Sequence, residues 1–373
     1  MSPYKRIGID GRAFYGVAAG TGRYVTELCK VLDQALPDAQ FHVYGNRPLQ
    51  MPVLNERWHW RSEPSWFWRL CPASLWYFLR CGLWASRDGI DVFWGCANFL
   101  PLRLSSRIQT VLTVYDLVFL LYPQTMGHKH RLVYKLFFGK SLARADRLVS
   151  ISQGTASRLL QHFGVTTDAI VRPAARSEFS PPSSQAIAQT RARFGLPEAY
   201  FLSVSTLEPR KNLPALLQAL FNLSKAAGSP NLCLVLVGQR GWLSRPLERL
   251  LQRSRRSGLQ IIELGYVPDD ALPTLYAGAQ AVLMPSLYEG FGMPVLEALQ
   301  CGAQVLTSDT PETREAGGQS ALYVTPDVAG IQAGLQKLLQ TATAAQAQPA
   351  ASAPAWSWQT EGQTLAQHIR SLW

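Results

Sequence analysis

Cysteine is scarce in this sequence: six cysteines occur among 373 residues. None of them forms a C-x-x-C pair, and none is spaced with the six histidines in the way that metal sites require. A disulfide framework and a cysteine-based zinc site are therefore not indicated. We expect the cysteines to be buried apolar residues of a protein that works in a reducing compartment.

Long apolar runs are also missing. No stretch reaches the roughly 18 consecutive apolar residues that a transmembrane helix needs. The first residues, MSPYKRIGIDGRAFYG, contain no apolar stretch after their basic residues, so no secretory signal is visible. We therefore expect a cytoplasmic protein.

Charged residues make up only 16% of the chain and hydrophobic residues 47%, which is typical of a globular protein with large cores. A chain of 373 residues is long for one domain, so we expect two. Residues 1–175 hold 21 Lys and Arg against 11 Asp and Glu, whereas residues 176–373 hold 15 against 14. Seven of the eleven tryptophans lie between Trp58 and Trp94. This distribution predicts an anionic, amphipathic partner for the first half.

What the sequence does contain is a repeated alternation of strand-like and helix-like segments. In the first half YKRIGIDGRAF, IDVFWG, IQTVLTVYDLVF and DRLVSIS are predicted strands, and VTELCKVLDQAL and HRLVYKLFFGKSLARA are predicted helices. A proline- and serine-rich break at residues 172–185 predicts a linker. After it the alternation restarts with YFLSVST and continues to AQVLTSD. The pattern predicts an α/β protein with two doubly wound parallel sheets and a cleft between them.

The predicted domains are residues 1–175 and 176–355, with a terminal segment of residues 356–373. The stretch TATAAQAQPAASAPA, which ends the second domain, has the composition of a connector. The terminal segment is predicted to be a helix, for which Ser357 is a suitable N-cap.

The stretch PSLYEGFGMPVLEALQCG, residues 285–302, places two glutamates around a glycine-rich loop. It follows a predicted strand, so Glu289 should lie at the carboxyl edge of a parallel sheet, where such folds bind ligands. Glu297 is expected in the first turn of the next helix, where a carboxylate is favoured. Gly290 and Gly292 would let the backbone approach a ligand closely. For the two carboxylates alone, a solvated loop residue and an ordinary helix residue are the alternative interpretation.

Two further loops are candidates for binding phosphate. EPRKN places Arg210 and Lys211 before a predicted helix, where two cations could hold a diphosphate; a solvated basic turn is the alternative. AGTGRY places Gly20 and Gly22 in the first strand-to-helix loop, and a plain structural turn is again the alternative. The pattern lacks the third glycine of the dinucleotide fingerprint, so an NAD site is poorly supported.

The whole second half, from LGYVPDD through the E-x7-E pair at Glu289 and Glu297 to SALYV, resembles the C-terminal domain of family-4 retaining glycosyltransferases of GT-B fold. The segments GIDGRAF, GTGRY, LTVYDLVFLLYP, ADRLVSIS, LEPRKNL and the final WSW helix also resemble their counterparts, so the resemblance covers most of the chain. It implies two Rossmann-like domains facing a cleft, with the C-terminal helix packing back toward the N-terminal domain. The forms EPRKNL and YEGFGMPVLEA are similar to bacterial O-antigen and lipopolysaccharide mannosyl- and rhamnosyltransferases.

The resemblance also implies roles for the site residues. Glu289 would accept hydroxyls of the transferred sugar, Glu297 would hold the ribose of the nucleotide, and Arg210 with Lys211 would stabilise the departing diphosphate. The donor site as a whole would include Glu297, Gly290, Phe291, Gly292, Gly20, Gly22, Tyr115 and Val267.

Two positions depart from the family pattern. Ser205 stands where many relatives carry an arginine, so Arg210 is expected to supply the missing charge. Tyr115 stands where relatives usually have a histidine; it could donate a hydrogen bond to the donor sugar but could not act as a base near neutral pH. Asp116 is a candidate for polarising the acceptor hydroxyl, with a turn-capping aspartate as the alternative.

The chain contains no D-x-D triplet, so a metal-bridged diphosphate is not suggested and no metal or other cofactor is expected. Without an obvious nucleophile, retention of configuration would require a same-face mechanism. In it the departing phosphate oxygen takes the proton of the acceptor, and the enzyme acts by positioning and electrostatics.

Residues 57–87 mix tryptophans with arginines, and HKHRLVYKLFFGK adds a second basic segment. Docking on anionic lipid headgroups is one interpretation, and ordinary helix packing is the other. The residues expected to face the membrane or the acceptor are Trp76, Arg80, Trp84, Arg87, Arg131 and Lys135.

The sequence therefore predicts a glycosyltransferase that moves a hexose, with mannose or rhamnose favoured, from a GDP-sugar to a lipid-linked saccharide in surface polysaccharide synthesis. The expected location is the inner face of the cytoplasmic membrane, with other assembly transferases as possible partners. A UDP- or dTDP-sugar transferase of the same fold is one alternative. A non-catalytic protein is the other, either a scaffold or a nucleic-acid-binding module with stacking tryptophans, although no recognised nucleic-acid motif occurs.

Overall fold

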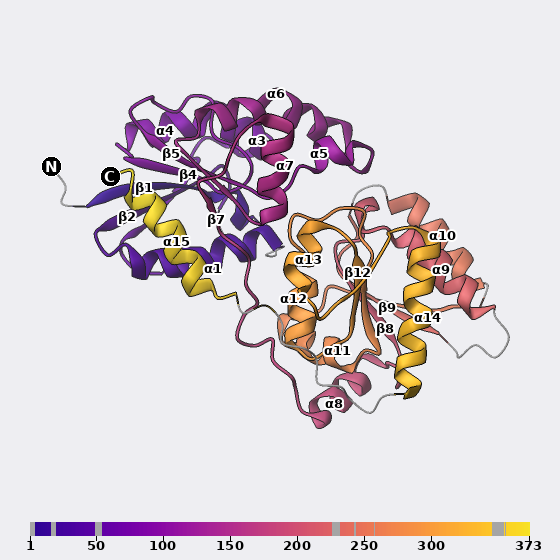
Figure 1. Cartoon of the computed structure of the whole chain (residues 1–373). Helices are drawn as coiled ribbons and strands as arrows, with labels where there is room; N and C mark the ends of the chain where they lie inside the picture. Colours follow the sequence, from indigo (N-terminus) through magenta and orange to yellow (C-terminus); the bar gives the residue numbers. More distant parts are fainter. Residues whose placement is uncertain are drawn as a thin grey trace. The chain divides into compact units, whose positions relative to one another are not determined.

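The computed structural model describes residues 4–15, 20–48, 54–225, 232–241, 244–256, 258–344, 354 and 356–373. The chain forms two compact units (Figure 1). The first unit consists of Met1–Phe119, His128–Pro173 and Trp356–Trp373, and the second of Leu120–Gly127 and Ala174–Ala355. The second unit thus includes residues 120–127, a short segment that the sequence analysis placed in the first domain.

The first unit contains a seven-stranded parallel sheet in the order β3-β2-β1-β4-β5-β6-β7. The interior strand β1 pairs on both sides, with Ile7 opposite Phe41 of β2 and Val92 of β4. All three side chains are fully buried, because helices cover both faces of the sheet. The strands are β1 Lys5–Asp10, β2 Ala39–Gly45, β3 Trp58–Ser62, β4 Val92–Gly95, β5 Gln109–Val114, β6 Arg147–Ser150 and β7 Ala169–Ile170.

The helices of this half are η1 Gly11–Phe14, α1 Gly20–Ala35, α2 Trp66–Leu70, α3 Ala73–Trp76, the π-helical η2 Tyr77–Cys81, α4 Gly82–Arg87, α5 Val118–Leu121, α6 His128–Arg144 and α7 Gln153–Phe163. In Figure 1, α1 lies on one face of the sheet, and α6 and α7 lie on the other. The sequence marks both ends of α7: the Ser152 side chain accepts from the Thr155 N–H, and Gly164 ends the helix with a φ of 66°.

One predicted strand is shorter than expected. The run IQTVLTVYDLVF forms a strand only over Gln109–Val114, and Val118–Leu121 is helical. Between the strand and the helix, Asp116 Oδ1 accepts from the Val118 N–H at 3.1 Å and caps the new turn.

The second unit contains a six-stranded parallel sheet in the order β10-β9-β8-β11-β12-β13. Leucines from α9, β9, β11 and α14, including Leu216, Leu234, Leu283 and Leu335, form one buried core. The strands are β8 Phe201–Val204, β9 Cys233–Val237, β10 Gln260–Gly265, β11 Ala281–Met284, β12 Val305–Ser308 and β13 Leu322–Val324. The helices are η3 Pro123–Thr125, α8 Ser184–Phe194, η4 Pro209–Lys211, α9 Leu213–Ser224, α10 Ser244–Arg256, η5 Asp269–Ala271, α11 Leu272–Gly278, α12 Met293–Gln300, α13 Pro311–Gly317 and α14 Val328–Ala344.

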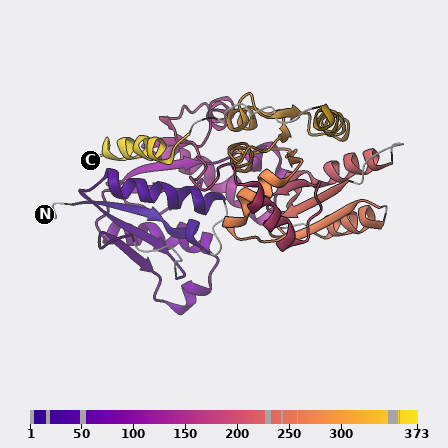
Figure 2. The same ribbon diagram turned by 90° about the horizontal axis from the view of Figure 1, so that it is seen from below.

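The last helix, α15 (Trp358–Arg370), packs in the first unit, as expected from the sequence. It lies along α1 in both views (Figures 1 and 2). Ser357 caps it by accepting from the Thr360 N–H, and Glu361 Oε2 accepts from the Arg172 N–H at 2.7 Å. Most of the predicted connector before it lies outside the described residues, although α14 extends into its first part.

The observed architecture confirms the predicted fold class of two Rossmann-like parallel sheets. Because all strands of a sheet run in one direction, the loops after their carboxyl ends gather at one edge. In the second unit this edge collects the loops that follow β8, β11 and β12. Across the described ranges, no helix combines the length and apolar character that spanning a membrane requires.

The contact between α15 and α1 can be tested at Gly362. A Cβ added there would lie 2.5 Å from the Val31 Cβ, so Gly362→Ala should overpack this contact and lower the free energy of unfolding by about 1–3 kcal/mol. Gly139 in α6 is the matched control, because a Cβ there meets no atom within 4 Å. Gly139→Ala should stabilise by up to about 1 kcal/mol. Urea unfolding of both variants measures this, and equal effects would contradict the close contact.

Candidate active site

The loop after β11 carries the first glutamate of the E-x7-E pair. Met284 ends the strand, and α12 begins at Met293 after Gly292, whose φ of 111° is a conformation that favours glycine. Pro294 in the first turn suits the start of the helix. Within this loop Glu289 is only 7% exposed, so its charge needs partners inside the protein.

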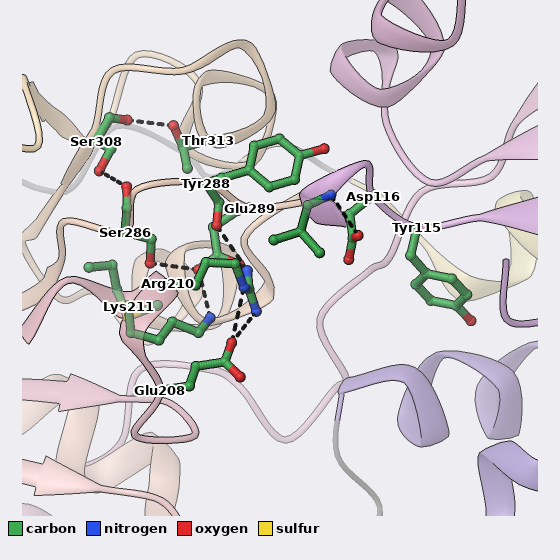
Figure 3. A network of polar contacts seen from close by, with 12 residues as sticks. Tyr115, Asp116, Glu208, Arg210, Lys211, Ser286, Tyr288, Glu289, Ser308 and Thr313 are labelled. Carbon is green, nitrogen blue, oxygen red and sulfur yellow. Dashed lines mark hydrogen bonds and ion pairs between the residues drawn. The ribbon is translucent and has the colours of Figure 1, made fainter. Parts of the chain in front are cut away.

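Both oxygens of the Glu289 carboxylate are hydrogen-bonded (Figure 3). Oε1 accepts from Lys211 Nζ and from Ser286 Oγ, each at 2.6 Å, and Oε2 accepts from Arg210 Nη1 at 2.7 Å. Burial alone would raise the pKa of Glu289, but the charges and hydrogen bonds of Lys211 and Arg210 outweigh it and lower the pKa to about 2. Glu289 is therefore an ionised, oriented acceptor at neutral pH.

Arg210 is held from its other side by Glu208, a residue that the sequence analysis did not select. Arg210 Nε and Nη2 donate to Glu208 Oε1 at 3.0 and 2.7 Å, and Nη1 also donates to the Tyr288 carbonyl at 2.9 Å. Glu208 is 5% exposed. We call Glu208, Arg210, Lys211 and Glu289 the charge quartet; its formal charges cancel.

The backbone of the quartet is fixed by Asn212. This residue adopts a left-handed φ of 57° between η4 and α9, and its Nδ2 donates to the carbonyls of Pro285 and Pro326 at 3.0 and 2.6 Å. The Leu287 N–H donates to the Arg210 carbonyl at 2.8 Å. The loops after β8 and β11 are thus joined by backbone and side chain alike, which places Arg210 and Lys211 on Glu289.

Glu297 lies in a different position on its helix from the one expected. It is the fifth residue of α12 and therefore lies beyond the first turn, where no acidic residue occurs. It is 4% exposed, and its Oε2 accepts from the Tyr276 hydroxyl at 3.0 Å. The argument from the helix dipole does not apply to it, and its carboxylate is buried and oriented by Tyr276 instead.

The remaining donor-site candidates of the second unit differ in accessibility. Phe291 and Val267 are 2% and 4% exposed, so both side chains are buried. Gly290 is half-buried. Ser205 Oγ is buried and, among the described residues, has no hydrogen-bond partner.

In the first unit Gly20 and Gly22 form the first turn of α1 and not a loop, because the helix begins at Gly20. Gly20 is exposed and Gly22 is buried. The rest of the predicted glycine loop, residues 16–19, lies outside the described residues.

Tyr115 is buried in the first unit, and its predicted hydrogen bond to the donor sugar stays a prediction. Its ring packs against Tyr24 and its buried hydroxyl lacks a hydrogen-bond partner within the described part of the chain. Burial raises the pKa of Tyr115 well above its ordinary value, so the side chain is a neutral core residue. Its backbone is clamped instead: its N–H donates to Asn98 Oδ1 at 2.7 Å, and its carbonyl accepts from Thr155 Oγ1 at 3.2 Å.

Asn98 was also missed by the sequence analysis. It has a left-handed φ of 63°, and its Nδ2 donates to the Tyr134 hydroxyl at 2.8 Å. It fixes the backbone directly before Asp116, which is half-buried at the carboxyl end of β5. Figure 3 shows the Tyr115 ring turned away from the Asp116 carboxylate.

Two of the residues expected at a membrane are engaged inside the first unit. Trp76 is fully buried and donates from Nε1 to Glu63 Oε2 at 2.7 Å, so it cannot face a membrane. Arg80 lies 3.6 Å from the same carboxylate and over the Trp68 ring. The buried Glu63 explains both contacts, because its charge needs donors.

Three of the exposed apolar residues lie earlier in the chain, on α2, and two others, Leu132 and Leu136, lie on α6. Trp66, Phe67 and Leu70 are 73%, 55% and 74% exposed, and α2 buries none of its residues. We call these three residues the α2 tip. Of the other expected membrane residues, Trp84 is half-buried and three are exposed: Arg87, Arg131 and Lys135.

No group of three or more His, Cys, Asp or Glu side chains that could hold a metal ion occurs in the described residues. The absence of a metal requirement stays a prediction from the sequence.

Two Rossmann-like parallel sheets, with a buried glutamate and two cations at the carboxyl edge of the second, define the class of GT-B glycosyltransferases. Solved structures support the fold. Sucrose-phosphate synthase from Thermosynechococcus elongatus matches with a TM-score of 0.72 and 19% identity over 99% of this chain and 94% of that one. WaaG, a glycosyltransferase involved in lipopolysaccharide biosynthesis, matches with a TM-score of 0.67 and 16% identity over 98% and 95%.

Family models cover both halves of the sequence. Residues 18–172 match glycosyltransferase family 4, and residues 187–353 match the group 1 glycosyl transferases. O-antigen chain mannosyltransferase B of Escherichia coli is 35% identical over 285 residues, which are 74% of this chain and 73% of that protein. The E. coli serotype-specific mannosyltransferase WbdA is 32% identical over 62% of this chain, but the match spans only 29% of WbdA. The chain belongs to the family-4 glycosyltransferases of GT-B fold and is homologous to the E. coli O-antigen mannosyltransferases.

The ionised state of Glu289 has a consequence for stability. Its pKa is about 2 in the folded protein against an ordinary 4.5, so its stabilising effect is complete above pH 4.5 and is lost as the pH falls toward 2. The free energy of unfolding should be higher for the parent than for Glu289→Gln near neutral pH, by on the order of 2–3 kcal/mol. That difference should shrink across this pH window. Urea unfolding at several pH values measures it, and a constant difference would contradict the ion pairing.

Proposed function

We propose that the protein transfers mannose from GDP-mannose to a lipid-linked saccharide during the synthesis of O-antigen or a related surface polysaccharide, with retention of configuration and without a metal ion. The observation that carries the proposal is the 35% identity to O-antigen chain mannosyltransferase B over 74% of the chain. The buried, ionised Glu289 beside two cations supports it, because a sugar needs an oriented acceptor and a diphosphate needs positive charge.

In this proposal Glu289 accepts hydroxyls of the mannose and Lys211 binds the diphosphate. Glu297, oriented by Tyr276, accepts the ribose hydroxyls. Asp116, half-buried at the end of β5, polarises the acceptor hydroxyl. The roles of Glu289 and Glu297 suit carboxylates that hydrogen bonds already orient within their own unit.

The reaction would proceed on one face of the sugar. The bond between the anomeric carbon and the diphosphate oxygen breaks, and the bonding electrons leave with the diphosphate. The acceptor oxygen bonds to the same face of the anomeric carbon, and its proton goes to the departing phosphate oxygen. The protein contributes positioning and electrostatic stabilisation of the leaving group, with no covalent intermediate.

The choice of donor is open to direct test. GDP at a hundred times its dissociation constant should stabilise the fold by about 2.7 kcal/mol, which is visible as a shift in melting temperature. GDP should act without magnesium, and UDP, ADP and dTDP should not act at comparable concentrations. If only UDP or dTDP raised the melting temperature, the donor would be a UDP- or dTDP-sugar and not a GDP-sugar. A transfer assay with GDP-rhamnose and GDP-mannose identifies the transferred sugar.

Catalysis and scaffolding make opposite predictions for Glu289. Glu289→Ala should abolish transfer of mannose from GDP-mannose to the saccharide lipids of a membrane extract, because the sugar loses its acceptor group. Glu198→Ala is the matched control, since Glu198 is exposed and outside the quartet. If Glu289→Ala kept the parent's activity, the proposed role would be wrong; a parent with no activity towards any nucleotide sugar would favour the scaffold.

We further propose that the first unit docks on the inner face of the cytoplasmic membrane through the α2 tip. A lipid-linked acceptor requires the enzyme to work at a bilayer surface. An exposed tryptophan and two exposed apolar side chains suit the interface between headgroups and hydrocarbon. Arg69 on the same helix and the surplus of cations in residues 1–175 suit anionic headgroups.

Replacement of the α2 tip should weaken binding to vesicles. Burial of one large apolar side chain contributes about 1.5–3 kcal/mol, so Trp66→Ser, Phe67→Ser and Leu70→Ser should each reduce partitioning on the order of tenfold. Leu160→Ser, at a 53% exposed leucine of α7, is the control and should change nothing. Cosedimentation with phosphatidylcholine vesicles, with and without phosphatidylglycerol, measures this. Equal binding of all variants would remove α2 from the interface.

A further inference from the structure

The two cations of the charge quartet differ in how firmly they are held. The Arg210 guanidinium donates to Glu208, to the Tyr288 carbonyl and to Glu289. It cannot turn to a ligand without leaving the carboxylate of Glu208, which is 5% exposed, without its cation. Arg210 is therefore a fixed support for the carboxylate of Glu289.

Lys211 is held by fewer hydrogen bonds than Arg210. Within the described residues its ammonium group makes one side-chain hydrogen bond, to Glu289 Oε1 at 2.6 Å. An ammonium group carries three donors on a flexible stem, so it can change partners by rotation alone. Glu289 Oε1 would keep its bond from Ser286 if Lys211 turned away, and Oε2 would keep its bond from Arg210.

We propose that Glu208 is a positioning residue that holds Arg210 on Glu289, and that Lys211 exchanges the Glu289 carboxylate for the diphosphate of the donor. The proposal deepens the function given above and rests on it for the identity of the ligand. The exchange frees one lone-pair direction of Glu289 Oε1 for a sugar hydroxyl while Arg210 and Ser286 keep the carboxylate in place. One event thus supplies a cation to the phosphate and an acceptor to the sugar.

Competition between Glu289 and the diphosphate has an unusual consequence. Glu289 is required for transfer, yet its carboxylate opposes binding of a diphosphate that carries no sugar. Removal of that charge should therefore tighten the binding of such a ligand. Removal of the Glu208 charge should also tighten the binding of this ligand. Arg210 then becomes available to the phosphate, and the quartet gains a net positive charge. Turnover should fall in both cases, since Glu289 is lost or misplaced.

Titration calorimetry with two probes tests the exchange. Inorganic pyrophosphate presents the diphosphate alone, and GDP adds the proposed base. Glu289→Gln and Glu208→Gln should each bind pyrophosphate on the order of tenfold more tightly than the parent, which corresponds to 1.4 kcal/mol. Glu198→Gln, at an exposed glutamate outside the quartet, should bind like the parent.

Turnover distinguishes positioning from a purely structural role. Glu208→Gln should lower kcat for GDP-mannose at least tenfold while KM stays equal or falls, and Glu208→Asp should restore part of kcat. A purely structural role would raise KM, lower kcat and weaken both probes together. Weaker or unchanged pyrophosphate binding by Glu289→Gln would overturn the exchange. If Glu208→Gln does not fold, Glu289→Gln alone is used for the test.

The two probes separate the exchange from the choice of donor. If the variants tighten pyrophosphate but no protein binds GDP, the exchange stands and the GDP-sugar is wrong. If the parent binds neither probe, Lys211 takes no diphosphate and the exchange is wrong.

Discussion

The paired carboxylate of Glu289 is the interaction on which the second unit depends. Charged side chains are costly to bury, and they persist here because each carboxylate of the quartet faces at least one cation at hydrogen-bond distance. The pairing also joins two loops that leave neighbouring strands, β8 and β11. Any movement of one loop would therefore separate charges in a poorly solvated place, which keeps the edge of the sheet rigid where chemistry requires it.

Because buried polar groups need hydrogen-bond partners, the polar groups of each unit's candidate site are paired with groups from other elements. Asn212 reaches from η4 to the carbonyls of Pro285 and Pro326, and Tyr276 of α11 reaches Glu297 of α12. In the first unit Asn98 after β4 holds the backbone before Asp116 after β5. Parallel sheets bring such loops together but do not orient them. The orientation comes from these side-chain bonds between neighbouring loops.

The alternation of apolar strands and helices was enough to predict both sheets, because burial on two faces leaves a strong local pattern. The E-x7-E motif likewise located Glu289. The burial of two residues was not predicted: Trp76 is buried and donates to Glu63, and Tyr115 is buried against Tyr24. Glu208 was missed because its role depends on Arg210, which lies between the carboxylates of Glu208 and Glu289. The burial and the roles of these residues depend on partners that a single sequence does not identify.

The position of α15 has a consequence for how the protein is made. The first unit is completed by Trp356–Trp373, which the ribosome adds after the entire second unit. Until then the apolar face of α1 that α15 covers lacks its partner, including the surface of Val31 opposite Gly362. The half of the protein that is translated first is thus the last to close. Nascent chains that stall before residue 356 should accordingly be the ones that engage holding chaperones.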